Sequence, residues 1–562
     1  MNTFKSSIPK TGFAGFKENW KADLLSGLLV SLIALPLSLG IAKASGFPPI
    51  MGVLTAIVGG VVVAFFAGSE LTIKGPAAGL IVICAGAVDE LGDAAEKLGL
   101  TLGYGTLEQL NAAAAAVKMP VEQFLGWHLA LGVVVAAAVV QILFGVLKIA
   151  KLADFFPLSA VHGMLAAIGI IIMSKQIHFA LGIDPALLKG KEPLELLAMI
   201  PQSLMNMNHH IAIIGFISVL IMFGMPMIKN DIVKKIPAAL IVLITAVILG
   251  QIFQLDGESF KSLKPLVDPG TFELHWNVSF EAITNSALTP IFLKYLLMFA
   301  LIGSLESLLT GKAIDLLDPY QRKANLSKDL TAVGVGNTIA GIFGGLPMIS
   351  EVARSSANIG NGGKTRWANL YHGLFLLVFV VALVSLIKMV PNAALSSILI
   401  FVGFRLAHPK EFAHTWHIGK EQLAIFIVTI IMTLATDLLI GIGSGILLKI
   451  IIHLINGVSV GSLFKAKYSI AEKTSAEFTM TVEGSAVFSN YLGLKKGLAK
   501  LPRQKKVVVD FSNCNLVDHS VMKNVTQFMK DYNDEGGKFG MIGLENHKPF
   551  AHDALSARKL AK

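Results

Sequence analysis

The chain has 562 residues, of which 54% are hydrophobic and only 15% are charged. Soluble domains carry about 25% charged residues, so this composition excludes an ordinary soluble protein and predicts one that crosses a membrane many times. The net charge of +10 fits basic cytoplasmic loops better than a nucleic-acid partner. The two cysteines give no disulfide framework, and no apolar stretch typical of a cleavable signal peptide is seen in the first twenty residues.

Apolar runs recur along the chain and predict fourteen membrane segments in two groups of seven. The first group is expected at about 24–42, 48–67, 76–88, 125–147, 155–182, 211–228 and 236–254. The second is expected at about 288–311, 328–343, 346–358, 368–390, 391–404, 421–440 and 441–457. The third segment of each group is too short for a straight spanning helix of about 20 residues. These two segments occupy corresponding places if the chain consists of two seven-segment repeats of opposite orientation.

Basic residues predict the orientation through the positive-inside rule. The N-terminal stretch holds Lys5, Lys10, Lys17 and Lys21. Counting fourteen crossings from there, the expected inner loops are basic at Lys148, Lys151, Lys229, Lys234, Lys235, Lys312, Arg322, Lys323, Lys364, Arg366, Arg405 and Lys410. We therefore expect a multi-pass protein of the inner cell membrane with both termini in the cytoplasm.

The composition changes after about residue 465. The stretch KKVVVDFSNCNLVDHSVMKNVTQFMKDYNDEGGKFGMIGL at 505–544 is typical of a buried strand, a loop, an amphipathic helix and a second strand. The sequence thus predicts three parts: a cytoplasmic N-terminal segment at 1–22, a membrane domain at 23–460 and a small cytoplasmic α/β domain at 465–562.

The two short segments are interrupted by glycine and proline, in GSELTIKGPAAGL and in GGLPMISEVARS. Each pattern is typical of a short membrane strand followed by a half-helix, and paired interruptions of this kind point to a transporter's midplane site. Two half-helix N-termini direct free N–H groups at one place, which favours an anion. Ala77, Ala78, Gly79 and Ser350 are small enough to let a ligand reach the backbone. The alternative is that these glycines and prolines only kink packed helices.

Charged residues also lie within the apolar runs. Glu306, with Thr310 one turn later, is expected either to bind Na⁺ or to carry a proton, because a carboxylate at membrane depth is functional by default. Lys74, Glu351 and Arg354 surround the two interruptions. With Glu306 they make two positive and two negative charges, so an anion would need a co-bound cation. The alternatives are a structural carboxylate and internal pairing, such as Lys74 with Glu351.

GLPMISEVARSSANIGNGGKT, GPAAGL and LPLSLGIAKASG resemble the tenth, third and first segments of the SulP family of anion permeases, and the C-terminal region resembles the STAS domain that usually ends these proteins. The resemblance implies a seven-plus-seven inverted repeat with core and gate subdomains, usually a homodimer. It implies ligand contacts near Leu37 on the first helix, at Glu351 and Val352, and at Pro76, Ala77, Ala78 and Ser350. Glu306 matches an acidic position used for cation coupling in bacterial relatives.

This chain departs from the family pattern at two positions, with Glu351 where many members have a small residue and Lys74 where many have serine. With an acid at position 351, this chain is similar in that respect to nucleobase transporters, which share the fold and also carry acidic residues in this part of it. In the STAS-like part, Ser520 after Asp518 matches a position phosphorylated in soluble STAS regulators, although Val521 replaces the usual glycine. Ser520 is thus a possible regulatory residue, with a plain helix N-cap as the alternative.

The sequence therefore predicts a secondary transporter of a small anion, first sulfate or bicarbonate, coupled to Na⁺ or H⁺ and without another cofactor. The alternatives are a symporter of C4-dicarboxylates or nucleobases and a receptor that signals through the STAS domain. No P-loop, metal-spaced cluster or nucleophile–base pair indicates an enzyme.

Overall fold

The computed structural model describes residues 8–148, 156–188, 191–230, 236–268 and 276–561. Lys5, Lys151, Lys234 and Lys235 lie outside these described residues. The chain divides into two compact units: 1–150 with 169–405, and 151–168 with 406–562. The division predicted at 22 and 460 stays a prediction.

The first group of predicted segments corresponds to helices in chain order. They are α1 (Gly12–Ala44), α2 (Pro49–Val61) with α3 (Val63–Phe66), β1 (Ile73–Pro76) with the 3-10 turn η1 (Ala78–Leu80) and α4 (Ile81–Lys97), α6 (Val121–Val146), α7 (Leu158–Ala180), α9 (His209–Gly224) and α10 (Ala238–Ile252). The short helices α5 (Leu107–Ala116) and α8 (Pro193–Met205) lie between them in the chain.

The second group follows the same plan. It comprises α12 (Thr289–Met298) with a π-helical turn at Phe299–Gly303 and α13 (Ser304–Leu317), α14 (Leu326–Ile342), β2 (Met348–Glu351) with α15 (Val352–Gly360), α16 (Trp367–Ala382), α18 (Asn392–Leu406), α20 (Lys420–Ala435) and α21 (Leu438–Ile455). The short α17 (Val384–Ile387) and α19 (Pro409–Ile418) intervene. The prediction of fourteen segments, with a strand opening the third of each group, is confirmed.

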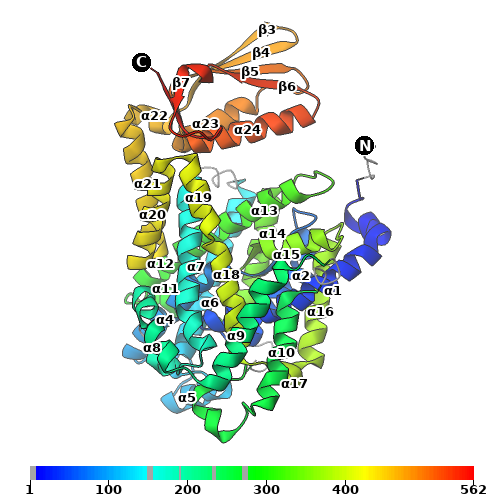
Figure 1. The fold of residues 1–562 in the computed structure, drawn as a ribbon, viewed down its shortest axis with the longest axis vertical. Coiled ribbons are helices and arrows are strands. Elements are labelled where there is room, and N and C mark those ends of the chain that lie inside the picture. The colour runs from blue at the N-terminus through cyan, green and yellow to red at the C-terminus, as the bar shows by residue number, and fades with distance from the viewer. Residues whose placement is uncertain (1–7, 149–155, 189–190, 231–235, 269–275, 562) are drawn as a thin grey trace. The chain divides into compact units, whose positions relative to one another are not determined.

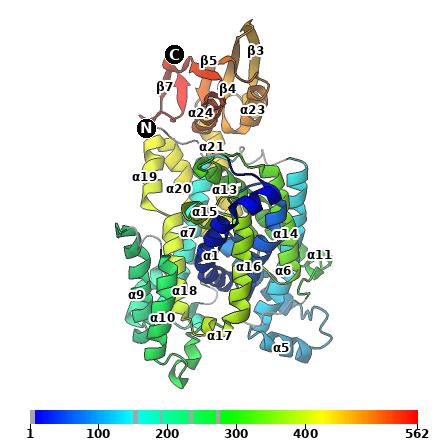
Figure 2. The same cartoon turned by 90° about the vertical axis from the view of Figure 1, so that its right-hand side faces the viewer.

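Small residues let the helices of the first unit approach closely. Figure 2 shows α1 and α16 side by side, and α16 also packs on α2. A Cβ added to Gly60 of α2 would lie 2.5 Å from the Cα atom of Gly373 on α16. Backbone contact of this kind is typical of packed membrane helices.

The backbone of the membrane strands is satisfied by side chains, as a strand in a low-dielectric layer requires. Asn337 of α14 accepts from the Met348 N–H at 2.6 Å and donates to its carbonyl at 3.1 Å. On β1, Asn369 accepts from the Lys74 N–H at 3.2 Å and Ser355 from the Ile73 N–H at 2.9 Å. The two strands therefore sit in a frame of polar side chains from α14, α15 and α16.

The C-terminal part of the second unit is the small α/β domain that the sequence predicts. Its strands are β3 (Lys467–Thr474), β4 (Glu477–Ala486), β5 (Lys506–Val517), β6 (Lys538–Ile542), β7 (His547–Pro549) and β8 (Arg558–Leu560), and its helices include α22 (Val460–Phe464), α23 (Tyr491–Leu498) and α24 (His519–Asp534). The order is β3-β4-β5-β8-β7, and β6 pairs with β5. Helices α23 and α24 lie on one face of the sheet (Figure 1).

Candidate functional site

The centre of the candidate site is the antiparallel pair of β1 and β2, which joins the two repeats. Its register sets Pro76 opposite Met348 and Ile73 opposite Glu351. The half-helix formed by η1 and α4 begins after Pro76, and α15 begins after Glu351. The positive dipole ends of these two helices therefore face the ladder from its opposite ends. The two ends of the ladder are about 10 Å apart, at roughly 3.3 Å per residue. Neither N-cap residue, Ala77 or Glu351, caps its helix with its side chain.

Side chains of the ladder alternate between its two faces, because successive residues of a strand point in opposite directions. Lys74 and Ser350 lie opposite each other on one face, whereas Gly75 and Glu351 belong to the other. The pairing of Lys74 with Glu351 that the sequence left open is therefore absent from the structure. Each has another partner.

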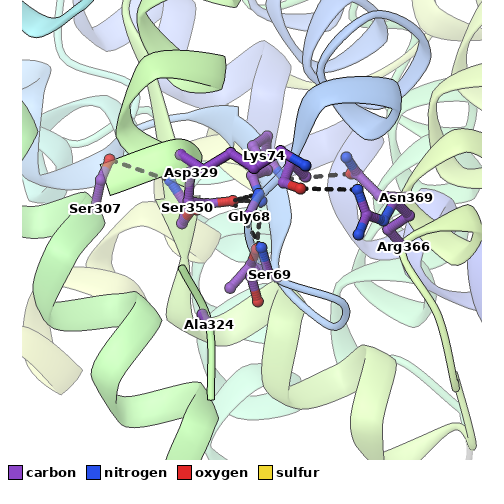
Figure 3. A network of polar contacts seen from close by, with 12 residues as sticks. Gly68, Ser69, Lys74, Ser307, Ala324, Asp329, Ser350, Arg366 and Asn369 are labelled. Atoms are coloured by element: carbon purple, nitrogen blue, oxygen red, sulfur yellow. Dashed lines mark hydrogen bonds and ion pairs between the residues drawn. The ribbon is translucent and has the colours of Figure 1, made fainter. Parts of the chain in front are cut away.

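On the first face, Lys74 forms a buried ion pair with Asp329 of α14 (Figure 3), with Nζ 2.9 Å from Oδ1. The same Oδ1 accepts from the Gly68 and Ser69 N–H groups at 3.0 and 3.2 Å. The hydroxyl of Ser350 donates to Oδ2 at 3.0 Å. Asp329 thus connects α14 with both strands and with the turn before β1.

On the second face, Arg354 in the first turn of α15 is completely buried. Its Nε lies 2.9 Å from Oε2 of Glu351, and its Nη2 donates to the Ser38 hydroxyl on α1 at 3.1 Å. A Cβ on Gly75 would lie 2.2 Å from Nη1 of Arg354. The guanidinium group therefore lies against β1 at Gly75, where only a glycine leaves room for it.

Glu306 of α13 lies against the other half-helix. A Cβ on Gly79 of η1 would be 2.0 Å from Oε1 of Glu306, so this carboxylate occupies the space that a larger residue would fill. Glu306 is buried, as is Thr310 one turn later, and its Oε1 has no hydrogen-bond partner. The π-helical turn at Phe299–Gly303 directly precedes this turn of α13, and such turns are frequent at functional sites.

Among the remaining predicted substrate contacts, Ala77, Ala78 and Val352 directly follow the two strands in the chain. Ala77 is buried, Ala78 is partly buried, and Val352 at the start of α15 is exposed. Leu37 is buried on α1, but the polar contact from this helix comes from its neighbour Ser38. Their roles as substrate contacts stay predictions.

Sequence reasoning missed Asp329, Ser38 and His372. Asp329 stands in the first turn of its apolar segment, where an acid is usually a solvated residue at a helix end. A carboxylate so close to an apolar run was nevertheless a signal. His372 on α16 is completely buried, and neither ring nitrogen has a hydrogen-bond partner.

Ser520 of the α/β domain is buried, and its hydroxyl oxygen accepts from Nζ of Lys449 on α21 at 2.9 Å. The N-cap of α24 is Asp518, whose side chain accepts from the Val521 N–H at 2.8 Å. Asp518 also lies 3.2 Å from the Lys449 ammonium group. The alternative assignment of Ser520 as the N-cap is thereby corrected, and its regulatory role stays a prediction.

Comparisons with known proteins agree with this architecture. Residues 20–429 match the model of the sulfate permease family. YvdB of Bacillus subtilis (strain 168) is 24% identical over 566 residues, covering 98% of this chain and 97% of YvdB. The bicarbonate transporter BicA of Picosynechococcus sp. (strain ATCC 27264 / PCC 7002 / PR-6) is 25% identical over 434 residues, 76% of this chain and 69% of BicA. The structure of SLC26A9 is similar with a TM-score of 0.65 at 15% identity, covering 94% of this chain and 85% of that chain.

Proposed function

The chain belongs to the sulfate permease family, and on that premise we propose that it is a secondary active transporter of a small inorganic anion. The name of the family points to sulfate and that of BicA to bicarbonate, so these are the first candidates. Transport proceeds by alternating access, in a homodimer of the cell membrane with both termini in the cytoplasm.

The observation that carries this proposal is the pair of half-helix N-termini, neither capped by its own side chain, that meet at the β1–β2 ladder. Free N–H groups and positive dipole ends bind anions at such places. Arg354 adds a buried cation beside the start of α15. The anion is held between the two N-termini, near Pro76, Ala77 and Glu351.

The charges of the site support coupling to a cation. Lys74 is balanced by Asp329, and Arg354 by Glu351. Glu306 remains as one further negative charge beside Gly79. An anion entering this place is repelled unless a cation enters with it, so either a proton on Glu306 or Na⁺ between Glu306 and Thr310 accompanies the substrate.

Uptake into proteoliposomes tests the proposal. Sulfate, bicarbonate and fumarate are offered to the full-length protein with and without inward gradients of Na⁺ or H⁺, and Glu306→Gln is the variant. We expect uptake of an inorganic anion that follows one of the gradients, and loss of that dependence in Glu306→Gln.

Three results would contradict parts of the proposal. Uptake of fumarate alone would favour the dicarboxylate alternative. Absence of any flux by well-folded protein would favour a receptor. Flux that ignores both gradients in the wild type would remove the symport step.

A further inference from the structure

The second face of the ladder holds polar atoms that nothing in the described part of the chain satisfies. Glu351 is 7% exposed, and its Oε1 has no hydrogen-bond partner although Oε2 is paired with Arg354. In Arg354, Nε is within ion-pair distance of Oε2 but forms no hydrogen bond, and Nη1 has no hydrogen-bond partner either. A buried acceptor and a buried donor that are both left without a partner are costly in a folded protein. Both atoms lie beside the N-terminus of α15, where the proposed anion binds.

Oε1 of Glu351 and Nη1 of Arg354 need different hydrogen-bonding partners. Nη1 of Arg354 and the N–H groups of α15 are donors, which any oxyanion satisfies. Oε1 of Glu351 is an acceptor when the carboxylate is ionised, and an anion with no hydrogen has nothing to offer it. A ligand that satisfies the whole site therefore carries acceptor oxygens on one side and an O–H group on another.

We propose that the site selects a monovalent oxyanion that carries an O–H donor, of which bicarbonate is the smallest common example, and that Glu351 accepts this hydrogen through Oε1. The inference rests on the proposed transport function and narrows its substrate class. Arg354 and the start of α15 bind the charged oxygens of the same ligand.

The other charges near the site also favour a monovalent anion over a divalent one. Two carboxylates lie along the same short stretch of chain, Glu351 beside Gly75 and Glu306 beside Gly79, so a divalent anion at this place is repelled more strongly than a monovalent one. Arg354 is the cation on this face, and its charge is already shared with Glu351. Sulfate, with two charges and no hydrogen, is disfavoured on both counts.

A comparison of three anions distinguishes the effect of the ligand's charge on affinity from the effect of its O–H group. Bicarbonate and nitrate are both planar and monovalent, but only bicarbonate has an O–H group, whereas sulfate is divalent without one. Transport currents of the full-length protein in liposomes on a solid support are recorded for each anion at mildly alkaline pH. Binding of each anion to the detergent-solubilised protein is measured by calorimetry. We expect the wild type to prefer bicarbonate over nitrate and over sulfate by about 10- to 100-fold, the usual effect of leaving a buried charged acceptor unpaired.

Variants of Glu351 test whether this residue accepts the hydrogen bond from the O–H group of the anion. In Glu351→Ala the ratio of bicarbonate to nitrate affinity falls toward one, because the acceptor is lost. In Glu351→Gln an acceptor oxygen remains but the charge is lost, so the preference over nitrate persists in part while sulfate binds better. Glu472→Gln on the exposed face of β3 is the control and leaves all ratios unchanged.

Ratios between anions distinguish recognition from damage, because a fold defect lowers all three affinities together. Equal affinity of the wild type for bicarbonate and nitrate, or an equal change for all three anions in Glu351→Ala, would overturn the inference while leaving anion transport intact. If Glu351→Ala fails to fold, the wild-type ratio and Glu351→Gln decide. A wild type that neither binds nor moves any of the three would refute the proposed function, and this inference with it.

Discussion

Lys74 and Asp329, 255 residues apart in the chain, form an ion pair in which both side chains are almost completely buried, with Nζ and Oδ1 2.9 Å apart. Removing one member leaves the other charge buried and unpaired, which costs about 3–5 kcal/mol. We expect Lys74→Ala or Asp329→Ala to lower the free energy of unfolding by about this amount, measured in detergent by denaturant titration.

The double variant Lys74→Met/Asp329→Leu tests the cause of that loss. Because it removes both charges, it should be more stable than Asp329→Ala, which leaves the Lys74 ammonium group buried and unpaired. The exposed pair of Lys97 and Asp93 on α4 is the control, and Lys97→Ala should change stability little. A double variant as unstable as the sum of the singles would show that the pair contributes through packing instead.

The sequence was sufficient to place the membrane segments, because hydropathy and segment length are local properties that fourteen apolar runs record directly. It also identified Glu306, since a carboxylate inside an apolar run is conspicuous. The partner of Lys74 could not be predicted in this way. It depends on the alternation of side chains along β1 and on the position of α14, and no local pattern near Lys74 encodes either.

Gly79 gives a prediction about the space that Glu306 occupies. In Gly79→Ala the new Cβ would lie 2.0 Å from Oε1 of Glu306, so the carboxylate must move away from the half-helix. We expect a loss of at least about tenfold in the uptake rate, as is usual when a positioned group is displaced by about 1 Å. Gly443→Ala on α21 is the matched control, because its added Cβ meets nothing within 4 Å. Equal uptake by the two variants would contradict this placement of Glu306.

A variant of Thr310 distinguishes coupling to Na⁺ from coupling to H⁺. If Na⁺ binds beside Glu306, the Thr310 hydroxyl is one of the oxygen ligands that a hard cation requires. Thr310→Val should then raise the half-saturating Na⁺ concentration. We expect an increase of about tenfold, because the free energy lost with one oxygen ligand is similar to that of one hydrogen bond. If a proton is the coupling ion, the same variant keeps the pH dependence of uptake, whereas Glu306→Gln removes it. Uptake by Thr310→Val is therefore measured against both gradients.

His519, at the start of α24, gives a pH dependence outside the membrane segments. Burial lowers the pKa of His519 from 6.5 to about 4, and Nδ1 lies 2.8 Å from the Leu555 carbonyl oxygen. The unfolded chain takes up the proton first as the pH falls, because its histidine has the higher pKa. The stability that neutral His519 contributes is therefore complete above about pH 6.5 and is lost as the pH falls toward 4, by roughly 3 kcal/mol.

The variant His519→Asn isolates this titration. The Asn amide N–H can replace the Nδ1–H donor to Leu555 but takes up no proton in this range. Pulse proteolysis of the full-length protein in urea, read from the C-terminal α/β domain, should show a stability that falls between about pH 6.5 and 4 in the wild type and a flatter profile in His519→Asn. The variant His552→Asn, at an exposed histidine of the same domain, is the matched control and should keep the wild-type slope. Equal slopes in all three proteins would show that the proton is taken up elsewhere.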